Sequence, residues 1–172
     1  MFIFESYLKK PTIKIWDIED LNKNPKKYYL CVNDNESIVE ILDQFDPKYI
    51  DGVICIKYND IAIMDYRYWD TVDDLWTYLL NLLGDYLENG EAQIYFPDQP
   101  ILLRLSSINK DLVLFSIQNF DDKKLSLPKR EFFTAILDYG EAFFESMQEY
   151  FGDQVNYDYP REKISELREL ID

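Results

Sequence analysis

Two long amphipathic segments bracket three short strand-like runs, and this arrangement limits the folds open to the chain. Apolar side chains recur at helical spacing over residues 71–88 and 129–151, as expected for helices that cover a sheet with one face. Between them, residues 91–96, 101–106 and 111–118 are apolar runs separated by turn sequences. Connections this short join antiparallel neighbours, so we expect a three-stranded meander between the two helices.

The first half of the chain alternates strand and helix signals. Residues 12–16 and 28–32 are predicted strands. A helix is expected over residues 36–45, capped by Asp34 or Asn35.

Residues 53–58 and 61–68 carry a β-hairpin signal, because the Asn-Asp pair at 59–60 separates two apolar runs. A two-residue turn at this place pairs Ile56 with Ile63. Both faces of the hairpin are largely apolar, so we expect it to lie centrally in a sheet and to be covered on both sides.

The long helices carry boundary signals at their ends. Asp70 is the expected N-cap of the helix over 71–88, and an Asn-Gly pair at 89–90 ends it. Pro128 is expected at the start of the second long helix. After a break, Pro160 opens a short C-terminal helix over residues 160–171.

Together these elements predict an α+β fold, a mostly antiparallel sheet of about six to seven strands with three to four helices packed on it. A chain of 172 residues fits one domain, residues 1–172. Its hydrophobic content of 47% is sufficient for a core without disulfides or metals.

Charge is the most unusual property of the composition. Thirty-three acidic residues against 18 basic ones leave a net charge of −15, and the chain has no histidine. A folded surface of this sign attracts cationic proteins and repels nucleic acid and anionic membranes, whose recognition needs basic patches. We therefore expect a basic protein as partner, with no direct binding to nucleic acid or to a membrane.

Several features predict a cytoplasmic, bacterial protein. No apolar run approaches the ~18 residues needed to cross a bilayer, and the first ten residues lack the apolar stretch of a signal peptide. Cys31 and Cys55 lie in apolar, strand-like contexts and are expected to be buried thiols. Scarce alanine beside abundant Asn, Ile, Tyr and Asp points to an AT-rich bacterial gene.

The absence of histidine removes most catalytic chemistry. No Ser–His or Cys–His nucleophile pair and no usual zinc site can form, and no glycine-rich phosphate-binding loop is present. Carboxylate chemistry survives, but adjacent acids such as those at 73–74 and 121–122 are typical of solvated surfaces. We therefore predict no catalytic, cofactor-binding or metal-binding residues.

An acidic stripe is predicted on one face of the longest helix. At ~100° per residue, Asp138, Glu141, Glu145 and Glu149 fall within one narrow arc, opposite a face rich in phenylalanine. No lysine or arginine occurs within residues 131–160. Like charges at i,i+4 destabilise a helix, so local stability does not account for the stripe and we predict that it binds a partner.

Two aromatic segments are further candidates for partner binding. Tyrosine, tryptophan and arginine anchor many interfaces because they give large contact areas. The candidate residues are Tyr66, Tyr68 and Trp69 before the first long helix, and Tyr157, Asp158 and Tyr159 after the second.

In size, acidity, tyrosine content and lack of catalytic residues, the chain resembles the small acidic immunity proteins with which bacteria neutralise basic toxins, often nucleases. The resemblance implies a non-catalytic inhibitor that covers the cationic surface of a toxin with its carboxylates. Two alternatives remain. One is a scaffold, adaptor or homodimer that uses the Tyr and Trp patches, and the other is a carboxylate-dependent hydrolase or divalent-metal binder.

Overall fold

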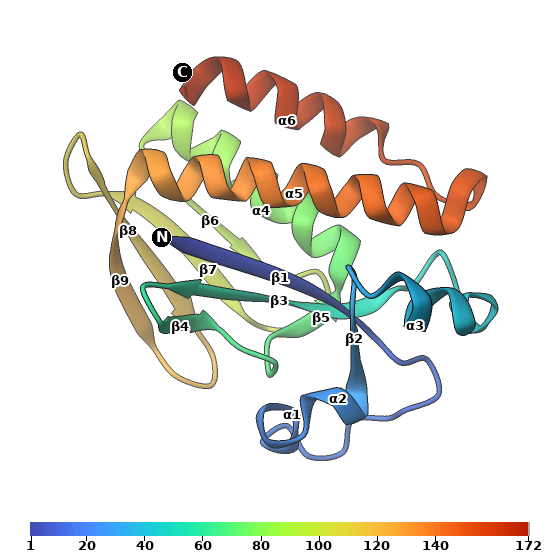
Figure 1. Ribbon diagram of the computed structural model, residues 1–172. Helices are drawn as coiled ribbons and strands as arrows, with labels where there is room; N and C mark the ends of the chain where they lie inside the picture. Colours follow the sequence, from blue (N-terminus) through green and yellow to red (C-terminus); the bar gives the residue numbers. More distant parts are fainter. Residues whose placement is uncertain (172) are drawn as a thin grey trace.

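The computed structural model describes residues 1–171, whose strands form two antiparallel sheets with a layer of helices above them (Figure 1). These residues contain nine strands and six α-helices. The predicted α+β class and antiparallel pairing are confirmed. The prediction of one sheet with six to seven strands is wrong, because the helix Val72–Asn89 carries the chain from a five-stranded sheet to a separate four-stranded one.

The first sheet is built around β1 (Phe2–Lys9) and β3 (Asp51–Tyr58), which pair antiparallel along most of their length. β2 (Tyr29–Cys31) pairs with the other edge of β1, close to the predicted strand over 28–32. β4 (Ile61–Met64) and β5 (Trp69–Thr71) pair with successive parts of the remaining edge of β3.

The N-terminal strand of this sheet is β1, and the strand predicted at residues 12–16 is wrong. Phe2 and Phe4 alternate with exposed residues and enter the core, which is the period of a half-buried strand. Ile13 and Ile15 also alternate with exposed side chains. After β1, however, the chain turns beneath the sheet, where these isoleucines pack against it without a neighbouring strand.

The hairpin of β3 and β4 turns at Asn59 and Asp60, as predicted. Both residues have positive φ angles, 45° and 69°, as a type I′ turn requires. The predicted register is wrong, because a bulge pairs Ile56 with Met64 instead of Ile63. The strand β3 is central and buried on both faces, whereas β4 is shorter than expected and lies at the edge.

The second sheet is a meander of β6 (Glu91–Tyr95), β7 (Leu102–Ser107), β8 (Leu112–Gln118) and β9 (Lys123–Pro128). The first three strands confirm the prediction. The fourth was not predicted, because its lysines and serine dilute the apolar pattern. Pro128 ends β9 and is also the N-cap of the helix that follows, as its helix-start signal indicated.

Three long helices cover the sheets. α4 (Val72–Asn89) ends at the left-handed Gly90, and α5 (Lys129–Phe151) continues into a 3₁₀ turn, Gly152–Gln154. Both confirm predicted helices. α6 (Asp158–Ile171) begins slightly earlier than expected. α5 runs along β1, and α6 lies outermost across α4 and α5 (Figure 1).

Three shorter helices complete the fold. α1 (Asp20–Lys23) and α2 (Pro25–Tyr28) lie beneath the first sheet and were not predicted (Figure 1). α3 (Asn35–Glu40) is capped by Asp34, whose side chain accepts the backbone N–H three residues later at 3.2 Å. α3 is shorter than the predicted helix over 36–45, because the chain tightens into the 3₁₀ turn Leu42–Gln44.

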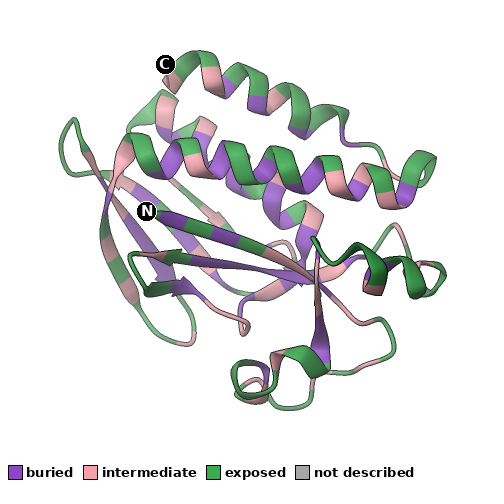
Figure 2. Cartoon of the chain, in the orientation of Figure 1, coloured by how far each residue is buried: buried purple, intermediate pink, exposed green. Residues whose placement is uncertain are grey.

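Buried side chains form two clusters, one on each face of the first sheet. Figure 2 colours the buried residues purple along the strands and helices. The main core lies between both sheets and the helices. Within it, the Phe132 ring of α5 lies 5.1 Å from Phe2 of the first sheet and 5.7 Å from Phe115 of the second. The lower cluster lies on the opposite face of the first sheet. Its buried members are Leu21, Tyr28, Tyr29, Val53 and Cys55.

Asp70, predicted to cap α4, joins the two sheets instead. It lies within β5 and is only 1% exposed, and Thr71 takes the N-cap position. The Asp70 carboxylate accepts the backbone N–H groups of Asp98 at 3.1 Å and Gln99 at 2.9 Å, in the turn between β6 and β7. Because β5 belongs to the first sheet and this turn to the second, one carboxylate holds the sheets together.

Replacing Asp70 with alanine leaves two partly buried backbone N–H groups without their charged acceptor, and such hydrogen bonds contribute about 1.5–3 kcal/mol each. We expect Asp70→Ala to lower the free energy of unfolding by about 3 kcal/mol, measured by urea denaturation with circular dichroism. The control is Asp98→Ala, which removes an exposed carboxylate and should cost less than about 0.5 kcal/mol. Equal losses in the two variants would contradict the anchoring role.

Candidate partner-binding site

The acidic stripe predicted on α5 is exposed, but half of it is compensated. Arg168 of α6 reaches across and pairs through its two terminal nitrogens with Asp138 and Glu141, each at 2.7 Å. The stretch of sequence around the stripe contains no basic residue, but α6 folds back alongside α5 and supplies one. Asp138 and Glu141 therefore hold α6 in place and are less available to a partner.

The other half of the stripe, Glu145 and Glu149, is exposed and makes no ion pair within residues 1–171. The neighbouring Tyr150 hydroxyl donates to the Val32 carbonyl at 2.6 Å and also meets the Asn35 side chain. These contacts tie the C-terminal end of α5 to the start of α3.

Two exposed acids lie at the start of α3, Asp34 as its N-cap and Glu36 in its first turn. Burial raises the pKa of the Tyr150 hydroxyl, and the charges of Asp34 and Glu149 raise it further, so both carboxylates lie close to the same group. We call Asp34, Glu36, Glu145 and Glu149 the acidic corner.

A shallow groove adjoins the acidic corner, between α5 and the paired strands β1 and β2. Its volume is about 50 Å³, well below the ~300–1,000 Å³ of small-molecule sites, so it admits the end of one side chain. It is lined by Phe4, Ser6, Val32, Asn33, Tyr139, Ala142 and Phe143.

The first predicted aromatic segment is largely internal. Tyr68 is fully buried in the main core, which contradicts the expectation of a surface residue. Tyr66 and Trp69 are partly buried against the lower cluster. The Tyr66 backbone N–H donates to Asn22 at 3.1 Å, and its carbonyl accepts the Tyr29 hydroxyl at 2.9 Å. These contacts serve the fold.

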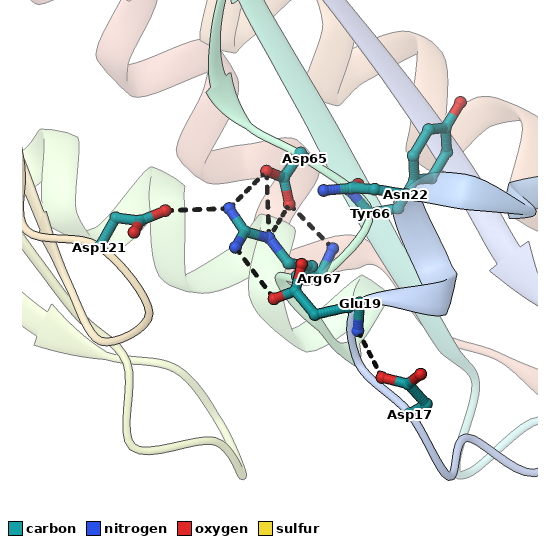
Figure 3. Close-up of polar contacts among 7 residues, drawn as sticks. All are labelled: Asp17, Glu19, Asn22, Asp65, Tyr66, Arg67 and Asp121. Atoms are coloured by element: carbon teal, nitrogen blue, oxygen red, sulfur yellow. Dashed lines mark hydrogen bonds and ion pairs between the residues drawn. The ribbon is translucent and has the colours of Figure 1, made fainter.

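Arg67, in the same segment, is the centre of an ion-pair cluster (Figure 3). Its guanidinium pairs with Asp65 at 2.9 Å, with Asp121 in the β8–β9 connection at 3.1 Å and with Glu19 beneath the first sheet at 3.5 Å. The hydrogen bonds to Asp65 and the surrounding negative charge raise the pKa of Arg67. Arg67 therefore fastens the second sheet and the segment around α1 to the first sheet.

The second predicted segment is divided between core and surface. Tyr157 is only 6% exposed and donates to the Asp73 carboxylate at 3.1 Å, so it is not a surface residue. Burial, with Asp74 adding to it, raises the pKa of Asp73. Asp158 is exposed, and Tyr159 is 54% exposed while donating to Asn81 of α4 at 2.7 Å. These two residues lie on the α4–α6 side, apart from the acidic corner.

No sign of a metal or membrane site appears in residues 1–171. No three cysteine or carboxylate side chains there are grouped to hold a metal ion, and none of their helices is both long and apolar enough to cross a bilayer. A cavity of about 640 Å³ lies where the start of α5 meets the ends of α4 and α6. It is lined by none of the ten residues predicted to bind a partner.

Comparisons with protein-family models, with curated proteins and with solved structures find no match for this chain. Its function is therefore inferred from its own surface and chemistry.

The Arg67 cluster generates a pH-dependent prediction. Burial opposes ionisation of Asp65, but the hydrogen bonds and charge of Arg67 outweigh it and lower the pKa of Asp65. A lowered folded-state pKa contributes stability above the unfolded pKa of about 3.9, and this stability is lost as the pH falls through the folded value. Asp65→Asn should therefore cost about 1–2 kcal/mol at neutral pH and progressively less below about pH 4, measured by urea unfolding.

The matched control is Asp122→Asn in the β8–β9 connection, which changes an exposed carboxylate that makes no ion pair within residues 1–171. Its stability difference from the wild type should stay near zero throughout the pH series. A constant penalty for Asp65→Asn at every pH would show that its charge does not contribute.

Proposed function

We propose that this chain is a non-catalytic, acidic binding protein of the bacterial cytoplasm, whose acidic corner covers the cationic surface of a basic protein as an immunity protein covers a toxin. The observation that carries the proposal is the pair Glu145 and Glu149, exposed and without an ion pair within residues 1–171. Cys31 and Cys55 are both free thiols, which accords with a reducing compartment.

The arrangement of these acids is unfavourable for the helix itself. Glu145 and Glu149 are like charges at i,i+4, a spacing that costs a few tenths of a kcal/mol. They also lie near the C-terminus of α5, where the helix dipole disfavours negative charge. Arg168 compensates the negative charges of Asp138 and Glu141. Glu145 and Glu149 have no such ion pair within residues 1–171. A cationic partner would supply the missing compensation.

The charge of the whole helical layer supports the same partner. Helices α4, α5 and α6 contain thirteen acidic and five basic residues, a net charge of −8. A surface field of this kind accelerates the encounter with an oppositely charged protein and is weakened by salt. We therefore expect association to be fast and strongly dependent on ionic strength.

The groove beside the corner supplies a place for one anchoring side chain. Its walls are apolar in part, with Phe4, Val32 and Phe143 among them, while Asp34 and Glu149 both act on Tyr150, which is bonded to the Val32 carbonyl. A lysine or arginine can lay its apolar stem along such a wall and direct its charge to the carboxylates. We propose that a basic residue of the partner inserts here.

The alternative of a scaffold or homodimer built on the predicted Tyr and Trp patches has less support. Tyr68 and Tyr157 are buried, and Tyr66 and Trp69 are partly covered. Tyr159 is exposed but isolated from the other patch. The remaining aromatic area is too dispersed for a single central anchor of the kind that dominates stable interfaces.

The proposal is tested by capturing partners from cells of the source organism with the tagged protein and identifying them by mass spectrometry. The captured partner should be basic, and its purified form should bind with a Kd that rises at least about tenfold between low and physiological salt. The double change Glu145→Lys and Glu149→Lys should raise the Kd by about tenfold or more, equivalent to about 1.4 kcal/mol.

A double variant with the same change of charge is the control. Glu88→Lys and Glu91→Lys alter exposed residues near Tyr86, which contacts Phe133 at the opposite end of α5. This variant should change the Kd by no more than about threefold, because distant charges are screened. Capture of a neutral or acidic partner, or equal weakening by both double variants, would reject the acidic corner as the binding site.

A further inference from the structure

Trp16 is the most exposed large hydrophobic side chain within residues 1–171, with 87% of its surface accessible. The other two tryptophans are covered, Trp76 completely and Trp69 in part. Exposed tryptophan is rare on surfaces that contact only water and is enriched at the energetic centres of interfaces. Sequence reasoning missed this residue, because it placed Trp16 at the end of a strand.

The fold holds Trp16 in its outward position. Ile13 and Ile15 pack against the lower cluster, so the alternating residues Lys14 and Trp16 face outwards. Before the tryptophan, the Lys9 ammonium donates to the Ile13 carbonyl at 2.6 Å. A side chain displayed on a fixed backbone loses less entropy on binding than one on a mobile loop.

The chain is also fixed directly after the tryptophan. The Asp17 side chain accepts the Glu19 backbone N–H at 3.0 Å, and Glu19 pairs with Arg67 of the first sheet. Leu21 then anchors α1 in the lower cluster, fully buried. Trp16 is therefore presented by a segment that is fastened on both sides (Figure 3 shows the contacts that follow it).

The segment that carries Trp16 has the opposite net charge to the rest of the protein. Residues 9–27 carry six lysines against three acids, a net charge of +3 in a chain of −15. The Lys14 ammonium lies 5.9 Å from the centre of the Trp16 ring. Lys23 and Lys26 are exposed and make no ion pair within residues 1–171. This basic segment lies beneath the first sheet, on the side away from α5 (Figure 1).

A hollow of about 480 Å³ opens beside the tryptophan. Its lining includes the apolar or aromatic residues Ile13, Trp16 and Tyr28. Its charged lining residues are Lys14, Lys27, Asp17 and Asp20, of which Lys27 and Asp20 pair with each other at 3.4 Å. A hollow of this size accepts one or two apolar side chains of an extended peptide.

We propose that the Trp16 surface is a second docking site, which binds an acidic segment of a partner protein. An apolar residue of the segment enters the hollow beside Trp16. One carboxylate of the segment pairs with Lys14, and another replaces Asp20 in its ion pair with the exposed Lys27. Charge decides between the possible occupants. A second copy docking the same surface would bring two basic segments together, and a nucleic acid would extend over the strongly acidic remainder of the chain. A short acidic segment that stays on residues 9–27 meets their net charge of +3.

The test uses the full-length protein as bait for a phage-displayed library of random dodecapeptides. Peptides recovered on the wild type should be rich in Asp or Glu together with aromatic or aliphatic residues. Fluorescence anisotropy of the best labelled peptide should show at least a tenfold rise in Kd for Trp16→Ala, and a similar rise for the double change Lys14→Glu and Lys27→Glu. Tyr49→Ala removes another exposed aromatic residue and should change the Kd less than twofold.

Trp16→Ala should keep the urea midpoint of the wild type, so that a weaker Kd reports the contact and not the fold. Recovery of basic peptides only, or of acidic peptides that bind Trp16→Ala as tightly as the wild type, would overturn the proposal. So would tighter binding of a labelled dT10 oligonucleotide than of the best peptide, or sedimentation as a dimer that Trp16→Ala abolishes.

Discussion

Polar contacts made by residues 65–71 hold the second sheet against the first, and the rest of the structure depends on this junction. Asp70 binds the backbone of the β6–β7 turn, and Arg67 pairs with Asp121 in the β8–β9 connection. The helical layer spans both sheets and can be continuous only if they keep a fixed relation, as the contacts of Phe132 with each of them require. The surface of α5 that we assign to a partner is thus positioned by side chains on the far side of the core.

Some acidic residues make contacts that stabilise the fold, and others face solvent without such contacts. Asp65, Asp70 and Asp121 serve the junction, where hydrogen bonds from Arg67 and from backbone groups compensate their charge. Asp138 and Glu141 bind α6 through Arg168. Glu145 and Glu149 remain after this division, which is why their lack of an ion pair within residues 1–171 is more informative than the total of −15.

Local patterns predicted local structure, and long-range contacts decided the remainder. Residues close together in the sequence determine the helical periodicity of α4 and α5 and the turn at Asn59 and Asp60. All three predictions were confirmed. The split into two sheets and the pairing of Arg168 with α5 depend on residues distant in sequence, which periodicity does not register. Tyr68 and Tyr157 were misassigned because the residue types that anchor interfaces between proteins also anchor interfaces within one.

The acidic corner and the Trp16 surface lie on opposite sides of the first sheet, so their occupants would not compete for space. Side chains pack on both faces of β3, so a structural change passing through the sheet from one site to the other would be costly. Charge offers another connection. A cationic partner on the corner would reduce the net negative charge that an acidic segment meets as it approaches Trp16, and linkage makes this help reciprocal. Such coupling acts through solvent and decays over a Debye length of about 8 Å at physiological salt. Only partners that extend towards each other around the sheet edge would therefore experience it.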